Sequence, residues 1–298
     1  MKISIIGAGS VGATTAYTLM LKNLASEIVL IDIDKKKAEG EAHDMGDCLP
    51  FAETSKIRTG DYSDARDSDI IIHTAGIAQK PGETRLVLAD KNKEITKSIF
   101  KEIGKLKSSC VVMVIANPVD VITYTVQEIS GLPHNQVFGT GTSLDSARLK
   151  SAISQQLNLD SKQVEGFLCG EHGDSEFVAW STVSIEGKPA SELLSKEDMK
   201  KIEDHVKNEA YEIINLKGAT FYGIASVAVD IVEAIVLNQD KIIPVSSRYD
   251  KDDEIPKVCF GYPCVIGING IIKRWEINLT NEEKEKLLKS AEKIHKYI

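Results

Sequence analysis

The sequence predicts an α/β fold, in which a doubly wound parallel sheet is followed by a second domain of mixed helices and strands. Three observations predict it: short runs of Ile and Val recur in the first half, helical stretches alternate with them, and this alternation stops after about Gly141. The chain has 298 residues, 42% of them hydrophobic, which is enough for one large or two average domains with cores.

The apolar runs of the first half predict parallel strands. They cover residues 3–6, 28–31, 70–73 and 111–115, and they are continuous rather than alternating. Strands of this kind must be covered on both faces, as in a parallel sheet. Stretches between them have helical spacing, for example at 14–24 and 86–106. Strand–helix–strand alternation implies right-handed crossovers, so we predict one domain over residues 1–141.

The second half predicts an α+β domain over residues 142–298. A helical stretch at 143–157 begins it, and hairpin-like segments follow around 167–185 and 257–269. Further helical stretches surround these segments, at 196–216, 222–237 and 280–298.

Composition excludes several classes of protein. The formal net charge is −8 and no long basic run occurs, which argues against a nucleic-acid or membrane surface. No apolar segment approaches the roughly 18 residues of a membrane span, and the first residues lack the regions of a signal peptide. The five cysteines form no C-x-x-C pair, which predicts reduced thiols in a cytoplasmic protein without a metal site.

A glycine-rich segment predicts a dinucleotide site. Gly7, Gly9 and Gly12 follow the first strand and open the first helix, where free N–H groups favour phosphate. Alone, this spacing also fits a simple tight turn. Asp32, however, lies 20 residues after Gly12 at the end of the second strand, where a carboxylate binds ribose hydroxyls and repels a 2′-phosphate. The combination predicts a Rossmann domain that binds NAD; the alternative for Asp32 is a turn residue.

Two further strand ends carry small or polar residues. Gly76 follows the run at 70–73, and Asn117 precedes Pro118 after the run at 111–115. Ligands of open α/β sheets bind at the carboxyl ends of strands. Gly76 would allow close approach of the dinucleotide. Asn117 fits equally well a ribose or substrate contact and an ordinary Asn-Pro turn.

Three segments supply charged groups for chemistry. A polar loop at 79–85 ends with Arg85, Asp145 and Arg148 stand three residues apart on a helix, and His172 lies between two glycines. Each has an ordinary alternative: an exposed arginine, a surface ion pair and a structural histidine. Together they suit hydride transfer to a 2-keto acid, which needs a histidine as proton donor, a carboxylate to orient it, and arginines for the substrate carboxylate and the carbonyl.

These residues resemble the L-lactate/malate dehydrogenase family, most closely its bacterial-type NAD-dependent L-lactate dehydrogenases. The resemblance runs nearly end to end, and its segments occur in the family's order. They are Gly7–Gly12 (GAGSVG), 82–85 (GETR), 117–120 (NPVD), 141–148 (GTSLDSAR), 170–174 (GEHGD) and 217–220 (KGAT).

The resemblance implies roles for individual residues. His172 would be the proton donor and acceptor, Asp145 would hold its ring, Arg148 would bind the substrate carboxylate, and Arg85 would polarise the carbonyl. Asn117 and Thr220 would contact the substrate. The positions that match the family's cofactor contacts are Gly7, Gly9, Val11, Gly12, Asp32, Lys37, Tyr62, Gly76, Ile77, Ser98, Ala116, Asn117 and Thr140.

The residue at position 79 bears on the substrate. In the resembling family this position is usually Gln in lactate enzymes and Arg in malate enzymes, and here it is Gln79. The second carboxylate of oxaloacetate, buried without a cation, would cost about 3–5 kcal/mol. We therefore predict L-lactate dehydrogenase activity, which reduces pyruvate and regenerates NAD in fermentation. Lys80 stands next to Gln79, and a malate dehydrogenase or a non-catalytic NAD-binding protein are the alternatives.

The resemblance also bears on assembly and regulation. The family is normally dimeric or tetrameric, so a homo-oligomer, by preference a homotetramer, is expected. Many bacterial relatives bind fructose 1,6-bisphosphate through an Arg and a His, and the matching positions here are Lys150 and Glu165. Because a carboxylate repels a bisphosphate, we predict weak activation at most.

Overall fold

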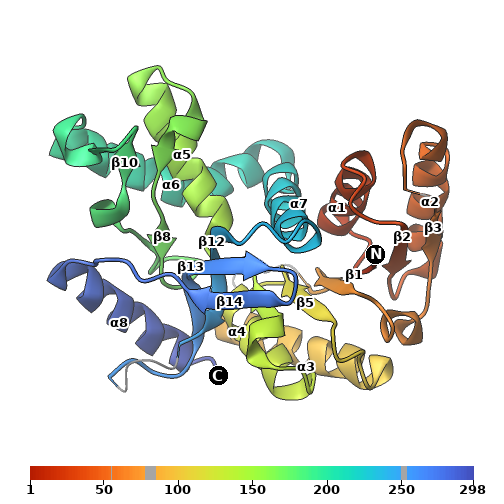
Figure 1. Ribbon diagram of the computed structural model, residues 1–298. Helices are drawn as coiled ribbons and strands as arrows, with labels where there is room; N and C mark the ends of the chain where they lie inside the picture. Colours follow the sequence, from red (N-terminus) through yellow and green to blue (C-terminus); the bar gives the residue numbers. More distant parts are fainter. Residues whose placement is uncertain (55, 78–84, 250–253) are drawn as a thin grey trace.

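The computed structural model describes residues 1–54, 56–77, 85–249 and 254–298. A nine-stranded sheet in the order β14-β13-β12-β6-β5-β4-β1-β2-β3 forms its centre (Figure 1). The six strands from β6 to β3 are parallel and confirm the doubly wound α/β fold. They comprise β1 (Lys2–Ile6), β2 (Glu27–Ile31), β3 (Lys56–Thr59), β4 (Ile70–His73), β5 (Val111–Val114) and β6 (Val137–Gly139).

Side chains on the parallel strands alternate between two cores. Ile70 and Ile72 pack on one face, where α1, α2 and α7 cover the sheet, whereas Ile71 packs on the other, under α3 and α4. Successive strand residues point to opposite faces, so a strand with both faces covered reads as a continuous apolar run. The covering helices are α1 (Ser10–Leu21), α2 (Lys35–Gly46), α3 (Arg85–Ile103), α4 (Val119–Ile129) and α7 (Tyr222–Val236).

Strands of the second half extend the first half's sheet. Strands β12 (Lys241–Arg248), β13 (Cys259–Gly267) and β14 (Gly270–Arg274) pair antiparallel, and Ser246 of β12 pairs with Gly139 of β6. The hairpin expected around 257–269 is therefore part of the central sheet. One continuous sheet connects the two halves of the chain.

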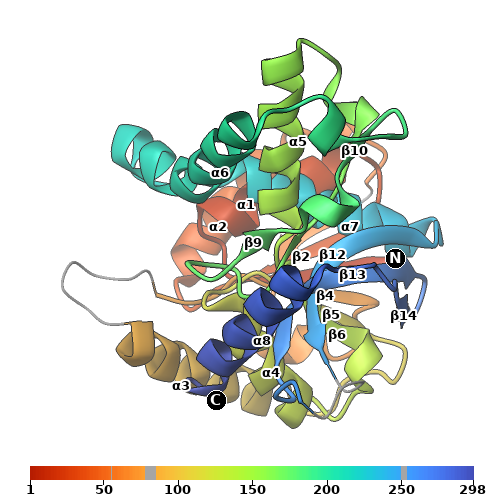
Figure 2. The same ribbon diagram turned by 90° about the vertical axis from the view of Figure 1, so that its left-hand side faces the viewer.

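The remaining elements of the second half lie at one side of this sheet. Helices α5 (Ser143–Leu157) and α6 (Lys196–Lys217) share an apolar core with short strands, and α8 (Asn281–His295) packs on β13 (Figure 2). The short strands are β7 (Val164–Glu165), β8 (Leu168–Cys169), β9 (Phe177–Val178), β10 (Ser184–Ile185) and β11 (Lys188–Pro189). The part of the chain that the structure describes also contains six 3₁₀ turns, namely η1 (Leu49–Phe51), η2 (Tyr62–Ala65), η3 (His134–Gln136), η4 (Ser161–Gln163), η5 (Trp180–Thr182) and η6 (Ala190–Glu192).

Local sequence signals fix the ends of the long helices. Ser195 and Asp198 form a reciprocal capping box at the start of α6, and Gly218 ends that helix in the left-handed conformation. Thr280 and Glu283 form the same box before α8. Within the described parts of the chain, no helix is long and apolar enough to cross a membrane.

Candidate active site

The glycine-rich loop after β1 has the backbone that its sequence predicts. Gly7 has φ +103°, a conformation that favours glycine. A Cβ atom on Gly12 would lie 1.8 Å from the carbonyl oxygen of Gly7, so only glycine allows α1 to start this close to the strand. Thr74, at the end of β4, donates a hydrogen bond from Oγ1 to the same Gly7 oxygen over 2.9 Å.

The N-terminus of α1 and the Asp32 carboxylate lie on the same side of this loop. Asp32 Oδ2 accepts the backbone N–H of Ala8 at 2.6 Å, and Oδ1 accepts that of Asp34 at 2.9 Å. Gly9 caps α1 without a side-chain hydrogen bond, and a Cβ placed on it would meet nothing within 4 Å. Open space therefore lies at the helix N-terminus, which fits a pyrophosphate, and the oriented Asp32 carboxylate suits a ribose diol.

Most of the other predicted cofactor residues lie around the same strand ends. Tyr62 is half-buried, and its pKa is raised by burial and by the charges of Glu102 and Asp32, which places it near Asp32. Ala116 and Thr140 are buried just after β5 and β6. Ser98 is different: it is exposed on α3, about three and a half turns from the start of that helix. The others occupy the loops or first helical turns after β1, β2 and β4, at Val11, Lys37, Gly76 and Ile77.

The buried Asn92 of α3 holds two of these strand-end loops together. Asn92 Oδ1 accepts a hydrogen bond from the backbone N–H of Ile77 at 2.9 Å, and Asn92 Nδ2 donates to the carbonyl oxygens of Ile77 and Asn117. Asn117 Oδ1 in turn accepts the N–H of Val119 at 3.2 Å, the first residue of α4. The predicted turn role of Asn117 is therefore present, and its side chain also borders the cavity described below.

His172, Asp145 and Arg148 form a line of hydrogen-bonded charges. His172 Nδ1 lies 2.7 Å from Asp145 Oδ2, and Arg148 Nη1 donates to Asp145 Oδ1 over 2.9 Å. The side chain of Asp145 is 2% exposed, that of Arg148 11% and that of His172 28%. Burial alone would lower the pKa of His172, but the Asp145 carboxylate outweighs it and raises this pKa to about 9.

Asp120, a residue of α4, fixes the backbone at His172. Its Oδ2 accepts the backbone N–H of His172 at 2.8 Å, and Oδ1 accepts the hydroxyl of Ser246 at 2.5 Å. Burial raises the pKa of Asp120 to about 7, against the hydrogen bonds from Ser246 and His172. This carboxyl group connects α4, β12 and the histidine loop.

The raised pKa of Asp120 predicts a pH-dependent stability. The unfolded chain releases this proton near pH 3.8, whereas the folded chain keeps it to about pH 7. The contribution of Asp120 to stability therefore falls as pH rises through this window. We expect the free energy of unfolding of Asp120→Asn, relative to the parent chain, to rise by about 2 kcal/mol from pH 5 to pH 8 in urea titrations. The exposed Asp67→Asn serves as control, and a difference that stays constant with pH would contradict the assignment.

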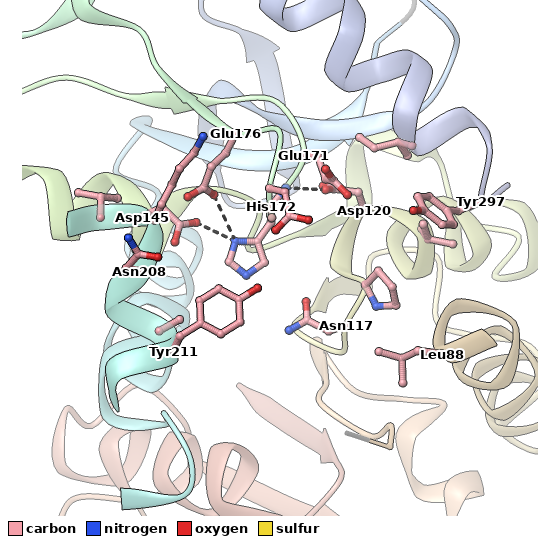
Figure 3. Close-up of a pocket in the computed structure, with 18 of the residues that line it drawn as sticks. Leu88, Asn117, Asp120, Asp145, Glu171, His172, Glu176, Asn208, Tyr211 and Tyr297 are labelled. Atoms are coloured by element: carbon pink, nitrogen blue, oxygen red, sulfur yellow. Dashed lines mark hydrogen bonds and ion pairs between the residues drawn. The ribbon is translucent and has the colours of Figure 1, made fainter. Parts of the chain in front are cut away.

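A cavity of about 510 Å³ opens beside His172 (Figure 3). Asp145 and Glu176 lie on the Nδ1 side of the ring, whereas Tyr211 and Asn117 face its other edge. Ile77, Asn117, Asp145, Arg148 and His172 of the predicted site all line the cavity.

Three of the predicted catalytic and substrate-binding residues are not placed at this cavity. Thr220 lies in the segment between α6 and α7 and is not among the described residues that line the cavity. Gln79 and the loop to which it belongs lie outside the described residues, as does the side chain of Arg85, the first residue of α3.

The structure adds residues that sequence reasoning missed. Asn92, Asp120 and Glu176 are buried and polar, and each contacts the site. Asp120 stands three residues after Asn117, and Glu176 four after His172, so spacing from a predicted residue was an available signal. Asp145, His172 and Glu176 are also spaced as metal ligands would be, but Arg148 already supplies a cation beside Asp145.

Comparisons with known proteins agree over the whole chain. A family model described as lactate/malate dehydrogenase, NAD binding domain, matches residues 1–139, and the α/β C-terminal domain of the same family matches residues 142–298. L-lactate dehydrogenase of Clostridium botulinum strain Loch Maree is 46% identical, over 98% of this chain and 94% of the relative. That of Acetivibrio thermocellus is 44% identical, over 100% and 96%.

Solved structures also match nearly the whole chain. A lactate dehydrogenase from a Medee basin deep-sea metagenome library has a TM-score of 0.94 and 40% identity, covering 99% of this chain and 97% of that one. The minor L-lactate dehydrogenase of Enterococcus mundtii, in a ligand-bound form, has a TM-score of 0.94 and 38% identity, covering 99% and 96%. The glycine loop, the charged line at His172 and these full-length matches place the chain in the lactate/malate dehydrogenase family.

Proposed function

We propose that the protein is an NAD-dependent L-lactate dehydrogenase, which interconverts pyruvate and L-lactate. The observation that carries this proposal is the line Arg148–Asp145–His172 at the cavity beside the strand ends. A protein that only bound a dinucleotide would have no need of a carboxylate-paired histidine there. The full-length L-lactate dehydrogenase relatives support the same activity.

Each residue of the candidate site has its own proposed role in the reaction. His172 holds a proton for the substrate oxygen on Nε2, because Nδ1 is directed at Asp145. Asp145 fixes the ring orientation and stabilises the imidazolium. Arg148 lines the cavity with a forked guanidinium that suits the substrate carboxylate. We propose that Arg85 polarises the substrate carbonyl. When bound, the nicotinamide supplies the hydride. A pKa of about 9 keeps His172 protonated at neutral pH, ready for pyruvate reduction.

The cofactor assignment rests on the loop after β1 and on Asp32. Both Asp32 oxygens already accept a backbone N–H, so the carboxylate is held at the strand end before any ligand binds. A fixed negative charge there favours a ribose diol and opposes a 2′-phosphate, and we therefore propose NAD rather than NADP. We also propose a cytoplasmic homo-oligomer, by preference a tetramer.

Substrate choice provides the test of this function. We expect kcat/KM for pyruvate to exceed that for oxaloacetate by at least about a hundredfold, because neutral Gln79 leaves the second carboxylate without a cation. NADH oxidation followed by absorbance on one preparation measures both values. Gln79→Arg should reverse the preference, and Gln79→Glu, which has the wrong charge, should not.

Either contrary outcome has a defined meaning. A preference for oxaloacetate in the parent chain would identify a malate dehydrogenase in which Lys80 or another cation replaces the arginine. No turnover of either keto acid, with NADH binding retained, would leave dinucleotide binding as the function.

A further inference from the structure

Glu176 is a buried carboxyl group beside the candidate catalytic histidine. The residue is 6% exposed, and its Oε2 lies 3.9 Å from His172 Nδ1. This oxygen has no hydrogen-bond partner among the described residues. Buried polar atoms are nearly always paired, and a buried carboxyl group without full pairing is costly. Figure 3 shows Glu176 beside His172. An apolar residue would fill the same space at lower cost, so the carboxyl group calls for a role.

The charges in this cluster depend on the proton of His172. When the imidazole is neutral, Asp145 and Arg148 balance each other, and a charged Glu176 would add an uncompensated anion. When the imidazole is protonated, two cations face Asp145, and a charged Glu176 completes the balance. Burial raises the pKa of Glu176 well above its ordinary value, and the charge of Asp145 and a side-chain hydrogen bond with Asp145 raise it further, whereas the His172 and Arg148 charges oppose this rise.

Other charged groups surround the cluster from every element packed against it. Asp120 of α4 binds the histidine backbone, and on α8 Lys293 pairs with Glu171 and Asp174 of the histidine loop. Further charges beside Glu176 come from α6 and α8, and they comprise Lys200, Glu203, Asp204, Lys207, Lys286 and Lys289. Among all of them, Asp145 and Glu176 are the described carboxylates within 4 Å of His172 Nδ1.

We propose that Glu176 is a positioning residue for the reaction: its carboxyl group is charged when the His172 imidazole is protonated and neutral when the imidazole is neutral. In this way Glu176 sets the pH range over which His172 exchanges its proton with the substrate. The proposal rests on the proposed dehydrogenase function. In this proposal, Glu176 does not contact the substrate. The residue acts through His172, on the Nδ1 side of the ring, while Nε2 serves the cavity.

The proposal predicts the effect of removing the charge. Glu176→Gln keeps the size of the side chain and a polar amide in place of the carboxyl group, but it cannot ionise. The imidazolium then loses one of its two nearby anions, and the pKa of His172 should fall by about one unit. On the alkaline limb of pyruvate reduction, kcat/KM should be about tenfold lower than in the parent chain. At pH values below the pKa of His172, kcat/KM for lactate oxidation should be about tenfold higher in Glu176→Gln than in the parent chain, since neutral His172 accepts the proton.

A substrate-free measurement separates this proposal from the proposed function. The His172 ring signal, assigned by its loss in His172→Asn, is titrated by NMR in the free chain and in Glu176→Gln. If the parent chain fails to reduce pyruvate, the proposed function fails, yet the NMR titration still decides the role of Glu176. Glu176→Met removes the same charge without hydrogen-bonding groups and serves if Glu176→Gln does not fold.

Glu283→Gln is the matched control. Glu283 is also 6% exposed, and it accepts the N–H of Ser181 away from the cavity. Its substitution should leave the His172 titration and both pH profiles unchanged. A purely structural role of Glu176 would lower stability or activity at all pH values alike. A folded Glu176→Gln in which the His172 titration moves by less than about 0.2 units would overturn the proposal.

Discussion

Replacing His172 by Asn is expected to lower kcat for pyruvate reduction by about 10³–10⁴-fold while the dissociation constant for NADH changes less than about threefold. Asn retains a polar group but cannot carry the proton. The cofactor residues after β1 and β2 belong to elements that do not contact His172 through any of the hydrogen bonds described above. Steady-state turnover and NADH fluorescence titration measure the two quantities.

The control for this variant is His205→Asn. His205 lies on α6, is half-exposed and pairs with Glu209, 3.5 Å away. Its substitution should leave turnover unchanged. If His172→Asn kept more than a tenth of the activity, another group would have to supply the proton, and the assignment of His172 would be wrong.

Arg148→Lys has the second largest expected effect. Lysine keeps the positive charge but lacks the planar guanidinium fork that donates two hydrogen bonds to a carboxylate. Its side chain is also shorter, so it would weaken the 2.9 Å contact that Arg148 makes with Asp145. Disrupting a buried charge pair of this kind costs about 3–4 kcal/mol, which corresponds to a loss in kcat/KM for pyruvate of about 10²–10³-fold. The loss should appear mainly as a higher KM.

A surface arginine tests whether this effect is specific. Arg58 of β3 pairs with Glu27 and Asp64 outside the cavity, so Arg58→Lys should alter KM for pyruvate less than twofold. An unchanged KM in Arg148→Lys, or an equal loss of NADH binding in that variant, would show that Arg148 has another role.

Much of the fold follows from the sequence because its parallel strands are buried on both faces. The helix predicted at 143–157 has those bounds, and the strand predicted at 70–73 likewise. The first helix begins at Ser10, within the glycine-rich segment predicted to open it, although helical spacing is visible only from residue 14 because the glycines at its N-terminus hide its periodicity. The joining of β12 to β6 was not predictable, since a single pair, Ser246 and Gly139, makes this contact across more than a hundred residues.

In the candidate site, only residues whose type is typical of a chemical role could be predicted from the sequence. His172, Asp145 and Arg148 have the required groups, and the structure brings them together. Asp120 and Glu176 are common residue types whose meaning depends on burial and on partners from distant elements, which the sequence alone does not reveal. The roles of Thr220 and Ser98 remain predictions from the resemblance.

The continuous sheet has a consequence for how the protein loses its structure. Because β12 joins β6 through the pair Ser246 and Gly139, the dinucleotide half alone would expose the edge of β6 that this pair covers. Removal of the second half would also uncover the apolar surface that α7 shields. We therefore expect the two halves to melt as one cooperative unit. A chimera of two relatives joined at residue 141 would need compatible residues on both sides of the contact between β6 and β12.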